Sequence, residues 1–357
     1  MSIATKRRQN SITSLGGNMT HSVVVGGAGF IGSWIVEEIL KDPSSRITII
    51  DNLISSEKWN ISTDPRVTFI EESAAKMNTF EKIGLPVDFI YQLACFHGNQ
   101  SSIDRPFDDL ENGLKTTLTT LEWARKYSPE SRIVYSSAGC ALAAKTWEIP
   151  EATEEIEQTS LYQDSPYSIS KISGEMYCNF YSKNYGLNIV RMRFQNVYGP
   201  REILGAGEWR GNDSTVWRNV VPTLIYKAMK NIDLNIFGKE ASRDFTYVED
   251  VARLVVRTAS IGQASNAYNI ATGEETFIVE LARQIIEITD SNSRINIFEK
   301  RPWDNSGRRL GNNNKLKYQF SLVPQVTINE GLKKTIEWFN LNFDRIEDTI
   351  LKHRSAT

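Results

Sequence analysis

The chain has 357 residues, 40% of them hydrophobic, which is enough for a full core and for two lobes. A net charge of -2 gives no electrostatic reason to expect nucleic acid or a membrane surface as a partner, and no apolar run approaches the roughly 18 residues of a membrane-spanning helix. The cysteines lie far apart, without a Cys-x-x-Cys pair or a histidine cluster, so we expect no metal and no disulfide framework, and we expect a cytoplasmic protein.

The N-terminal segment is polar and carries Lys6-Arg7-Arg8 without an apolar stretch, so it does not predict a signal peptide. Met19 stands just before the first strand-like run and is a candidate native start. We expect residues 1–20 to be a largely disordered leader.

Apolar strand candidates alternate with helical stretches through the first half of the chain. The expected strands cover residues 23–25, 47–50, 67–70, 87–91, 132–135 and 188–193. Two expected helices cover residues 30–40 and 107–126, and in the second of them Leu110, Leu114, Leu118 and Leu121 share one face. Continuous apolar strands that alternate with helices predict an α/β protein with a doubly wound parallel sheet. After Asn196 the elements become shorter and richer in Gly and Trp, which indicates a second lobe.

A glycine-rich loop, Gly-Gly-Ala-Gly-Phe-Ile-Gly, covers residues 26–32 and follows the first expected strand. Gly26, Gly29 and Gly32 let the backbone turn tightly and approach a pyrophosphate at the positive N-terminus of the next helix. Asp51 ends the next expected strand, where its carboxylate would accept hydrogen bonds from an adenosine ribose and repel a 2′-phosphate. The loop and this acid together predict a Rossmann-type fold that binds NAD in preference to NADP.

A tyrosine and a lysine stand four residues apart in Ser-Pro-Tyr-Ser-Ile-Ser-Lys, residues 165–171. Ser165 and Pro166 are a plausible helix start, so Tyr167 and Lys171 lie on the same helical face. A cation about 4 Å from a phenol at an effective dielectric constant near 20 is worth roughly 4 kcal/mol, which is enough to make the phenol a usable base near neutral pH.

These motifs together resemble the extended short-chain dehydrogenase/reductase family of NAD-dependent nucleotide-sugar epimerases and dehydratases. The resemblance covers roughly residues 22–340 and includes the glycine loop, Asp51, Asn112, and the serine strand Tyr135-Ser136-Ser137. It continues through the segments at residues 193–200, 243–250 and 268–273. The resemblance implies that NAD is contacted by Gly26, Gly29, Phe30, Ile31, Gly32, Asp51, Asn52, Leu93, Ala94, Ser136, Tyr167 and Lys171.

The resemblance also implies a nucleotide-diphosphate sugar as the substrate. The asparagine of Asn-x-Tyr-Gly-Pro and the arginine of Arg-Asp-Phe contact the substrate in relatives, and these are Asn196 and Arg243 in this chain. Arg301 resembles a further diphosphate-contacting position, and an arginine fork suits phosphate chemically. His97 and Arg210 complete the expected substrate contacts, although a loop histidine without a substrate is the alternative for His97.

The residues after the serine strand distinguish among the reactions of the family. Dehydrating relatives resemble Thr-Asp-Glu there and decarboxylating relatives resemble Ser-Ser-Glu, whereas this chain has Ala138-Gly139-Cys140 and no carboxylate. Most relatives carry a catalytic Ser or Thr at the position of Ala138, so we consider Ser137 as the replacement hydroxyl.

Cys140 has a counterpart in the GDP-mannose 3,5-epimerases, which show Ser-Ser-Ala-Cys at this place and use the cysteine to remove protons beside a 4-keto group. Their partner lysine corresponds to Arg210 in Trp209-Arg210-Gly211, and an arginine would stabilise an enolate but is a poor acid. Cys140 is therefore a candidate base, and the alternative is a small buried residue. The remaining cysteines, Cys95 and Cys178, are expected to pack in the core.

We therefore predict a Rossmann domain over residues 21–197 plus about 241–272. A smaller, mixed α/β substrate lobe is expected over about 198–240 plus 273–345, followed by a tail at 346–357. The predicted function is an NAD-dependent nucleotide-sugar epimerase that passes through a transient 4-keto sugar and inverts C4, or C3 and C5. The alternatives are a 4,6-dehydratase or C4 oxidoreductase, and, in another class, a non-catalytic NAD-binding regulator or scaffold. The resemblance implies a homodimer formed by the 107–126 helix and the Tyr167 helix.

Overall fold

The structure is a computed structural model, and it describes residues 19–96, 98–139, 146–155, 163–202, 219–301 and 307–355. Residues 1–18 of the leader expected over residues 1–20 lie outside the described residues. Thr20 already belongs to the first strand. In the described part of the chain, no helix is long and apolar enough to cross a membrane.

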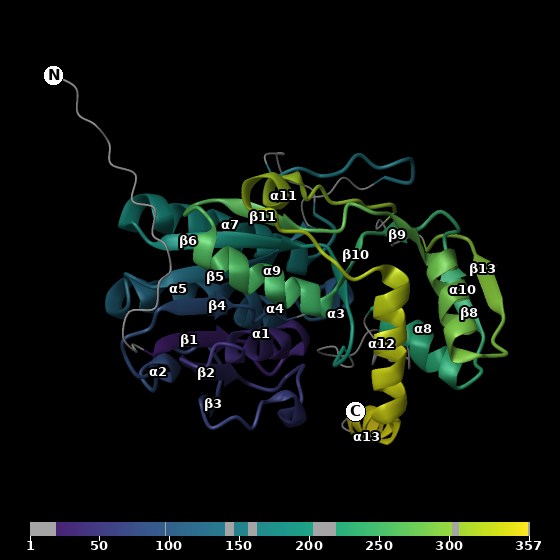
Figure 1. Cartoon of the computed structure of the whole chain (residues 1–357), viewed down its shortest axis with the longest axis horizontal. Helices are drawn as coiled ribbons and strands as arrows, with labels where there is room; N and C mark the ends of the chain where they lie inside the picture. The colour runs from purple at the N-terminus through teal and green to yellow at the C-terminus, as the bar shows by residue number, and fades with distance from the viewer. Residues whose placement is uncertain are drawn as a thin grey trace.

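Seven parallel strands form the central sheet in the order β11-β6-β5-β4-β1-β2-β3 (Figure 1). In chain order they are β1 Thr20–Val25, β2 Ser45–Asp51, β3 Val67–Glu71, β4 Phe89–Gln92, β5 Arg132–Ala138, β6 Asn188–Phe194 and β11 Ala267–Ile270. The order reverses between β1 and β4, which is where a doubly wound sheet binds its ligand at the carboxyl ends of the strands. The predicted doubly wound parallel sheet is confirmed.

Helices cover both faces of this sheet and give each face its own buried core. On one face, α1 Phe30–Leu40 and α9 Val248–Ile261 bury Ile35 and Val255 against strand residues such as Val24. On the other face lie α2 Met77–Phe80, α5 Thr116–Tyr127 and α7 Pro166–Tyr185. Burying one such aliphatic side chain stabilises the folded state by about 1.5–3 kcal/mol. The cores on the two faces of the sheet therefore both hold the strands in place.

The prediction of one regular helix over residues 107–126 is wrong. The chain forms α3 Asn99–Asp104, α4 Pro106–Asp109, a π-helical turn η2 Leu110–Lys115, and then α5. The π turn places an extra residue in the helical path, so the helical face rotates across it. Leu110 is consequently 50% exposed, while Thr116 and Thr120 of α5 are buried. The predicted leucine face does not exist as one buried stripe.

The remaining elements build a second core beside the sheet. Among the described residues, three short strand pairs occur: β8 Leu234–Phe237 with β13 Ile295–Phe298, β9 Ser242–Arg243 with β12 Thr276–Phe277, and β7 Asn196–Tyr198 with β10 Phe245–Tyr247. The helices are α8 Val220–Met229, α10 Ile278–Thr289, α11 Asn314–Phe320, α12 Ile328–Leu341 and α13 Phe343–Ser355. The second core includes Leu224, Leu281 and Phe339, together with Ile346 and Ile350 of the segment expected to be a tail. These two isoleucines make α13 part of the packed structure.

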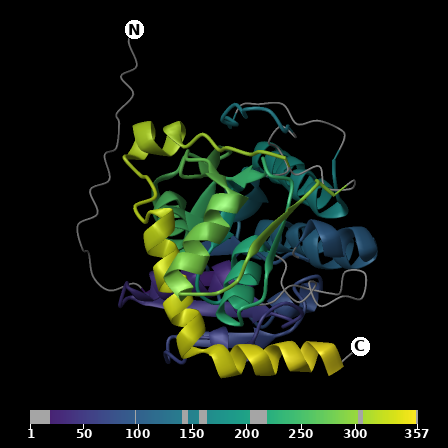
Figure 2. The ribbon, with the colours of Figure 1, turned by 90° about the vertical axis from the view of Figure 1, so that its right-hand side faces the viewer.

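The chain turns sharply between α12 and α13, so that α13 lies across one end of the molecule (Figure 2). Trp338 of α12 stacks on Trp59 of the short helix η1 Lys58–Asn60, with ring centroids 5.9 Å apart. The guanidinium of Arg345 on α13 lies 4.9 Å from the centroid of the same Trp59 ring. The C-terminal helices are thereby attached to the loop that follows β2.

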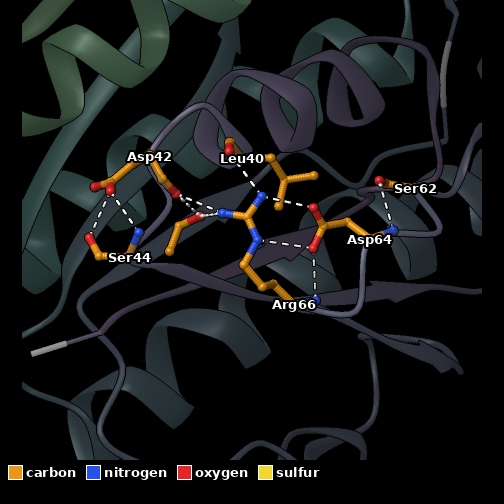
Figure 3. Close-up of polar contacts among 7 residues, drawn as sticks. Leu40, Asp42, Ser44, Ser62, Asp64 and Arg66 are labelled. Atoms are coloured by element: carbon orange, nitrogen blue, oxygen red, sulfur yellow. Dashed lines mark hydrogen bonds and ion pairs between the residues drawn. The ribbon is translucent and has the colours of Figure 1, made fainter.

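Arg66 fixes the opposite edge of the sheet, where α1 ends and β3 begins (Figure 3). Its guanidinium donates to both carboxylate oxygens of Asp64 and to the carbonyl oxygens of Leu40 and Asp42. The hydrogen bonds from Arg66 lower the pKa of Asp64 to about 2. This cluster lies at the amino ends of β2 and β3 and so stabilises the side of the sheet away from the ligand-binding edge.

Candidate active site

The glycine loop joins β1 to α1 and approaches neighbouring backbone closely. Gly26 has φ 84°, and a Cβ atom placed on it would lie 2.7 Å from the backbone nitrogen of Ala94. A Cβ atom on Gly32 would collide with the carbonyl oxygen of Gly26. Gly29 precedes α1 without a side-chain cap, so the first N–H groups of the helix are available to an anion. The loop has the shape that a pyrophosphate requires.

Asp51 lies at the end of β2 with its carboxylate on the cavity wall. One oxygen accepts from the Ala28 N–H at 3.1 Å, and the other accepts from the Leu53 N–H at 2.9 Å and the Ser56 hydroxyl at 2.8 Å. Burial raises the pKa of Asp51, and these hydrogen bonds oppose that rise. The neighbouring Asn52 donates to Asn112 at 2.9 Å and so ties this edge of the site to the π turn.

Tyr167 and Lys171 lie on the first two turns of α7, whose start is fixed by Ser165 and Pro166. The Ser165 hydroxyl accepts from the backbone N–H of Ser168 at 3.2 Å. Lys171 is buried, and its ammonium group donates to the Ser136 carbonyl at 2.7 Å and to the Ser136 hydroxyl at 3.2 Å. The ammonium nitrogen lies 5.8 Å from the centroid of the Tyr167 ring, so a fixed positive charge faces the phenol.

The serine strand β5 ends with the methyl group of Ala138 and, one residue earlier, the hydroxyl group of Ser137. Ala138 packs against Ile172 and Tyr167, at the place where most relatives carry a hydroxyl. Ser137 lines the cavity, and its hydroxyl also hydrogen-bonds to Glu175. Burial alone would raise the pKa of Glu175, but hydrogen bonds from Arg193 and Ser137 hold it below its usual value. The role of Ser137 as the replacement hydroxyl stays a prediction.

A single cavity of about 820 Å³ runs from the glycine loop past α7 to the second core, within the size range of ligand sites. It brings together the described residues that the sequence singles out. These are Gly26, Gly29, Phe30, Ile31, Gly32, Asp51, Asn52, Leu93, Ala94, Ser136, Ser137, Tyr167, Lys171, Asn196, Arg243 and Arg301. His97, Cys140 and Arg210 lie outside the described residues.

Two arginines that are distant in sequence from the glycine loop, Arg243 and Arg301, also line the cavity. The guanidinium of Arg243 donates to the carbonyl oxygens of Ser242 at 2.6 Å and Gly307 at 2.7 Å. The guanidinium of Arg301 lies 3.9 Å from the centroid of the Phe237 ring, which also lines the cavity. These contacts hold two cationic side chains on the wall of the same cavity, and their role in binding a diphosphate stays a prediction.

Sequence reasoning missed several cavity residues because their burial depends on distant segments. Arg309 is only 4% exposed and contacts Asp164, just before α7, at 3.4 Å. Glu202 is buried on the cavity wall, although a glutamate that follows Asn-x-Tyr-Gly-Pro gives no sign of burial in the sequence. Cys95 lies on the cavity wall rather than in the expected core, whereas Cys178 is buried as predicted. Within the described ranges, no group of three or more His, Cys, Asp or Glu side chains could hold a metal ion.

The fold and cavity define a Rossmann-type enzyme with a tyrosine–lysine pair beside a dinucleotide site. The model of the NAD dependent epimerase/dehydratase family matches residues 22–271, and the chain belongs to this family. A putative UDP-glucose 4-epimerase from Methanocaldococcus jannaschii is 30% identical over 322 residues, which cover 90% of this chain and 98% of that protein.

Solved structures extend this similarity to nearly the whole chain. The Bordetella bronchiseptica enzyme WbmF in complex with NAD+ is 44% identical, with a TM-score of 0.83 over 95% of this chain and 98% of that one. The same enzyme has been solved with NAD+ and UDP, with 43% identity, a TM-score of 0.82, and 95% and 98% of the two chains covered. UDP-glucose 4-epimerase of Thermotoga maritima, solved with UDP-glucose, is 28% identical, with a TM-score of 0.80 and coverage of 91% and 100%. The extended short-chain dehydrogenase/reductase family and NAD as the cofactor are thus confirmed.

Proposed function

We propose that this protein is an NAD-dependent nucleotide-sugar epimerase that acts through a transient 4-keto sugar. The observation that carries the proposal is one cavity that the glycine loop, the Tyr167–Lys171 pair and the two arginines Arg243 and Arg301 line together. Such a cavity can hold a dinucleotide and a nucleotide-sugar side by side. The relatives named as UDP-glucose 4-epimerases support a UDP-sugar as the substrate class.

In the proposed reaction, Tyr167 removes the proton of the sugar 4-hydroxyl and later returns it. The buried ammonium group of Lys171, fixed by Ser136, favours the ionised phenol. Arg243 and Arg301 hold the diphosphate, so that the sugar can turn within the cavity while its anchor stays bound. NAD supplies the oxidation and reduction when it is bound.

The strand end favours epimerisation over the other reactions of the family. Ala138 and Gly139 bring no carboxylate to the position where dehydrating and decarboxylating relatives carry one. Inversion at C4 needs no further acid or base. Inversion at C3 or C5 would need one, and Cys140 with Arg210 is our proposal for that alternative.

Replacement of Tyr167 by Phe tests the catalytic proposal. Without the phenol oxygen, turnover of UDP-sugars should fall by about 10²–10⁴-fold, the usual contribution of a general base. NAD should stay bound, because the glycine loop and Asp51 are untouched. Tyr177→Phe is the matched control, since this tyrosine of α7 is 38% exposed and does not line the cavity. Full activity in Tyr167→Phe would overturn the mechanism, and inactivity of the unaltered protein on all nucleotide-sugars would favour the non-catalytic alternative.

A reaction in deuterated water identifies the carbon that is inverted. Epimerised product without solvent deuterium at C3 and C5 is expected for the C4 reaction, because the hydrogen at C4 is carried by the cofactor. Deuterium at C3 or C5 would instead establish proton removal beside the ketone, and net release of NADH would indicate a dehydrogenase.

A further inference from the structure

Tyr167 and Lys171 also line a second, much smaller void in the protein. Its wall includes Asp109, the last residue of α4, and Ser170 of α7. The void has no room for a water molecule, so the groups on its wall face one another without solvent between them. Among the described residues that line it, Asp109 is the one acid and Lys171 the one cation.

The Asp109 carboxyl is buried and only half satisfied. The residue is 1% exposed, its Oδ2 accepts from the Ser170 hydroxyl at 2.5 Å, and its Oδ1 has no hydrogen-bond partner. Burial raises the pKa of Asp109, whereas the Ser170 hydrogen bond and the positive charge of Lys171 lower it. A buried carboxylate is tolerated where a cation compensates it, and the ammonium group on the wall of the same void meets this need.

The π-helical turn η2 brings this carboxyl against the helix that carries the Tyr167–Lys171 pair. Asp109 stands directly before the turn, and Leu110, which follows it, is 50% exposed, so the two side chains face opposite ways. A Cβ atom on Gly113 of η2 would lie 3.6 Å from the Ser170 Cβ and 3.8 Å from the Asp109 Oδ1. The missing side chain at Gly113 therefore lets η2 approach α7 closely, with Asp109 at the contact.

The other charged groups on the surrounding elements are engaged with one another. These pairs are Asp108 with Arg105, Glu111 with Lys115, Glu122 with Arg125, and Glu175 with Arg193. Asp104 of α3 is exposed to solvent. Two further titratable groups, Tyr135 and Cys95, line the void, and burial raises the pKa of Tyr135 well above its usual value, so that this phenol stays neutral.

We propose that Asp109 is a positioning residue of the Tyr167–Lys171 pair: its buried carboxylate is the counter-charge of the Lys171 ammonium group and sets the pH range in which Tyr167 removes a proton. The ammonium group favours the phenolate, and the carboxylate opposes it across the dry void. A phenol that first removes a proton and later returns it needs a proton affinity near the working pH, which the two opposed charges provide. The assignment rests on the proposed function, in which Tyr167 carries this proton.

NMR of the NAD-loaded protein with tyrosines isotope-labelled at Cζ tests the proposal without a substrate. The Tyr167 signal is identified by its loss in Tyr167→Phe. Asp109→Asn keeps the shape of the side chain and can still accept from Ser170, but it removes the charge, so the midpoint of the Tyr167 titration should fall by about one pH unit. A unit charge within about 10 Å at an effective dielectric constant near 20 has an effect of this size. The acid limb of the kcat/KM profile for UDP-sugars should move in the same direction.

Two control variants separate the charge of Asp109 from its packing. Ser170→Ala removes the hydrogen bond to Asp109 but keeps the charge, and Asp108→Asn removes a neighbouring charge that is paired with Arg105 at the surface. Both should leave the Tyr167 midpoint nearly unchanged, and Asp109→Glu, which retains the charge, should give a midpoint close to that of the unaltered protein.

An unchanged midpoint in Asp109→Asn, or an equal fall in Ser170→Ala, would overturn the role of Asp109 and leave the proposed function intact. The expected fall in a protein that turns over no nucleotide-sugar would instead support the counter-charge and count against the proposed function.

Discussion

At the scale of single residues, the site depends on how Lys171 is surrounded. Its ammonium nitrogen lies 5.6 Å from the Tyr135 ring centroid as well as near Tyr167, and the Tyr135 hydroxyl donates to the Lys171 carbonyl at 3.1 Å. Asp109 is buried behind it and accepts a hydrogen bond from Ser170. Burial raises the pKa of Asp109, while Ser170 and the Lys171 charge lower it. The lysine is thus fixed from several sides and cannot swing away from the phenol.

Ser137 illustrates how a hydroxyl near the site can serve the fold. Because it hydrogen-bonds to Glu175, which pairs with Arg193 through two bonds of 2.8 Å, its removal leaves a buried carboxylate with one donor fewer. We expect Ser137→Ala to lower the free energy of unfolding by about 1–2 kcal/mol. If Ser137 only supports Glu175, turnover should change less than about tenfold, measured alongside denaturant unfolding.

The control for this variant is Ser131→Ala, which removes another buried serine hydroxyl, bonded to the Val87 carbonyl at 2.6 Å, at the opposite end of β5. It should cost a similar free energy of unfolding without any effect on turnover. A hundredfold loss of turnover in Ser137→Ala with unchanged stability would instead establish Ser137 as the replacement hydroxyl.

At the scale of elements, local motifs were predictable and long-range geometry was not. The helix expected over residues 30–40 coincides with α1, because the glycine loop marks its start in the sequence. The π turn η2 was not predictable, since leucine spacing is consistent with a regular helix and the extra residue is accommodated by packing against α7. Glu202 was missed for a related reason: its burial is created by segments distant in sequence.

Helices α4 and α7 present apolar side chains on the outer surface of the molecule. Phe107 is 83% exposed, and Ile169, Met176 and Phe180 on α7 are 53%, 58% and 49% exposed. Such side chains gathered on two helices in contact are typical of a protein interface. We propose that a second copy of the chain covers them, as the resemblance implies.

A charge introduced into this surface tests the dimer. The unaltered protein should sediment as two chains of 40.5 kDa, and Met176→Glu should sediment as one, because an unpaired carboxylate would be buried between the copies. Tyr318→Glu on α11 is the control, since Tyr318 is 76% exposed but lies on another helix. A single-chain mass for the unaltered protein, or an intact dimer in Met176→Glu, would contradict the proposed interface.

At the scale of the whole molecule, the loop after β2 connects the cofactor site to the C-terminal helices. Asn60 donates to the Ala28 carbonyl of the glycine loop at 3.0 Å, while the adjacent Trp59 stacks on Trp338 of α12. One short helix therefore supports the NAD-binding turn and anchors the second core. No periodicity in the sequence indicates this contact, because the two tryptophans are brought together only by the assembled fold.

A double-mutant cycle measures how strongly this contact joins the two parts of the molecule. We expect Trp59→Ala and Trp338→Ala each to lower the free energy of unfolding, because both remove partly buried aromatic surface. The double variant should lose about 0.5–1.5 kcal/mol less than the sum of the single variants, which is the usual coupling of a stacked aromatic pair. Arg345→Ala serves as a comparison, since it removes only the cation next to Trp59 and should cost less than either tryptophan. Strict additivity of the two tryptophan variants would show that the stack does not join the C-terminal helices to the loop, and that the second core alone holds them in place.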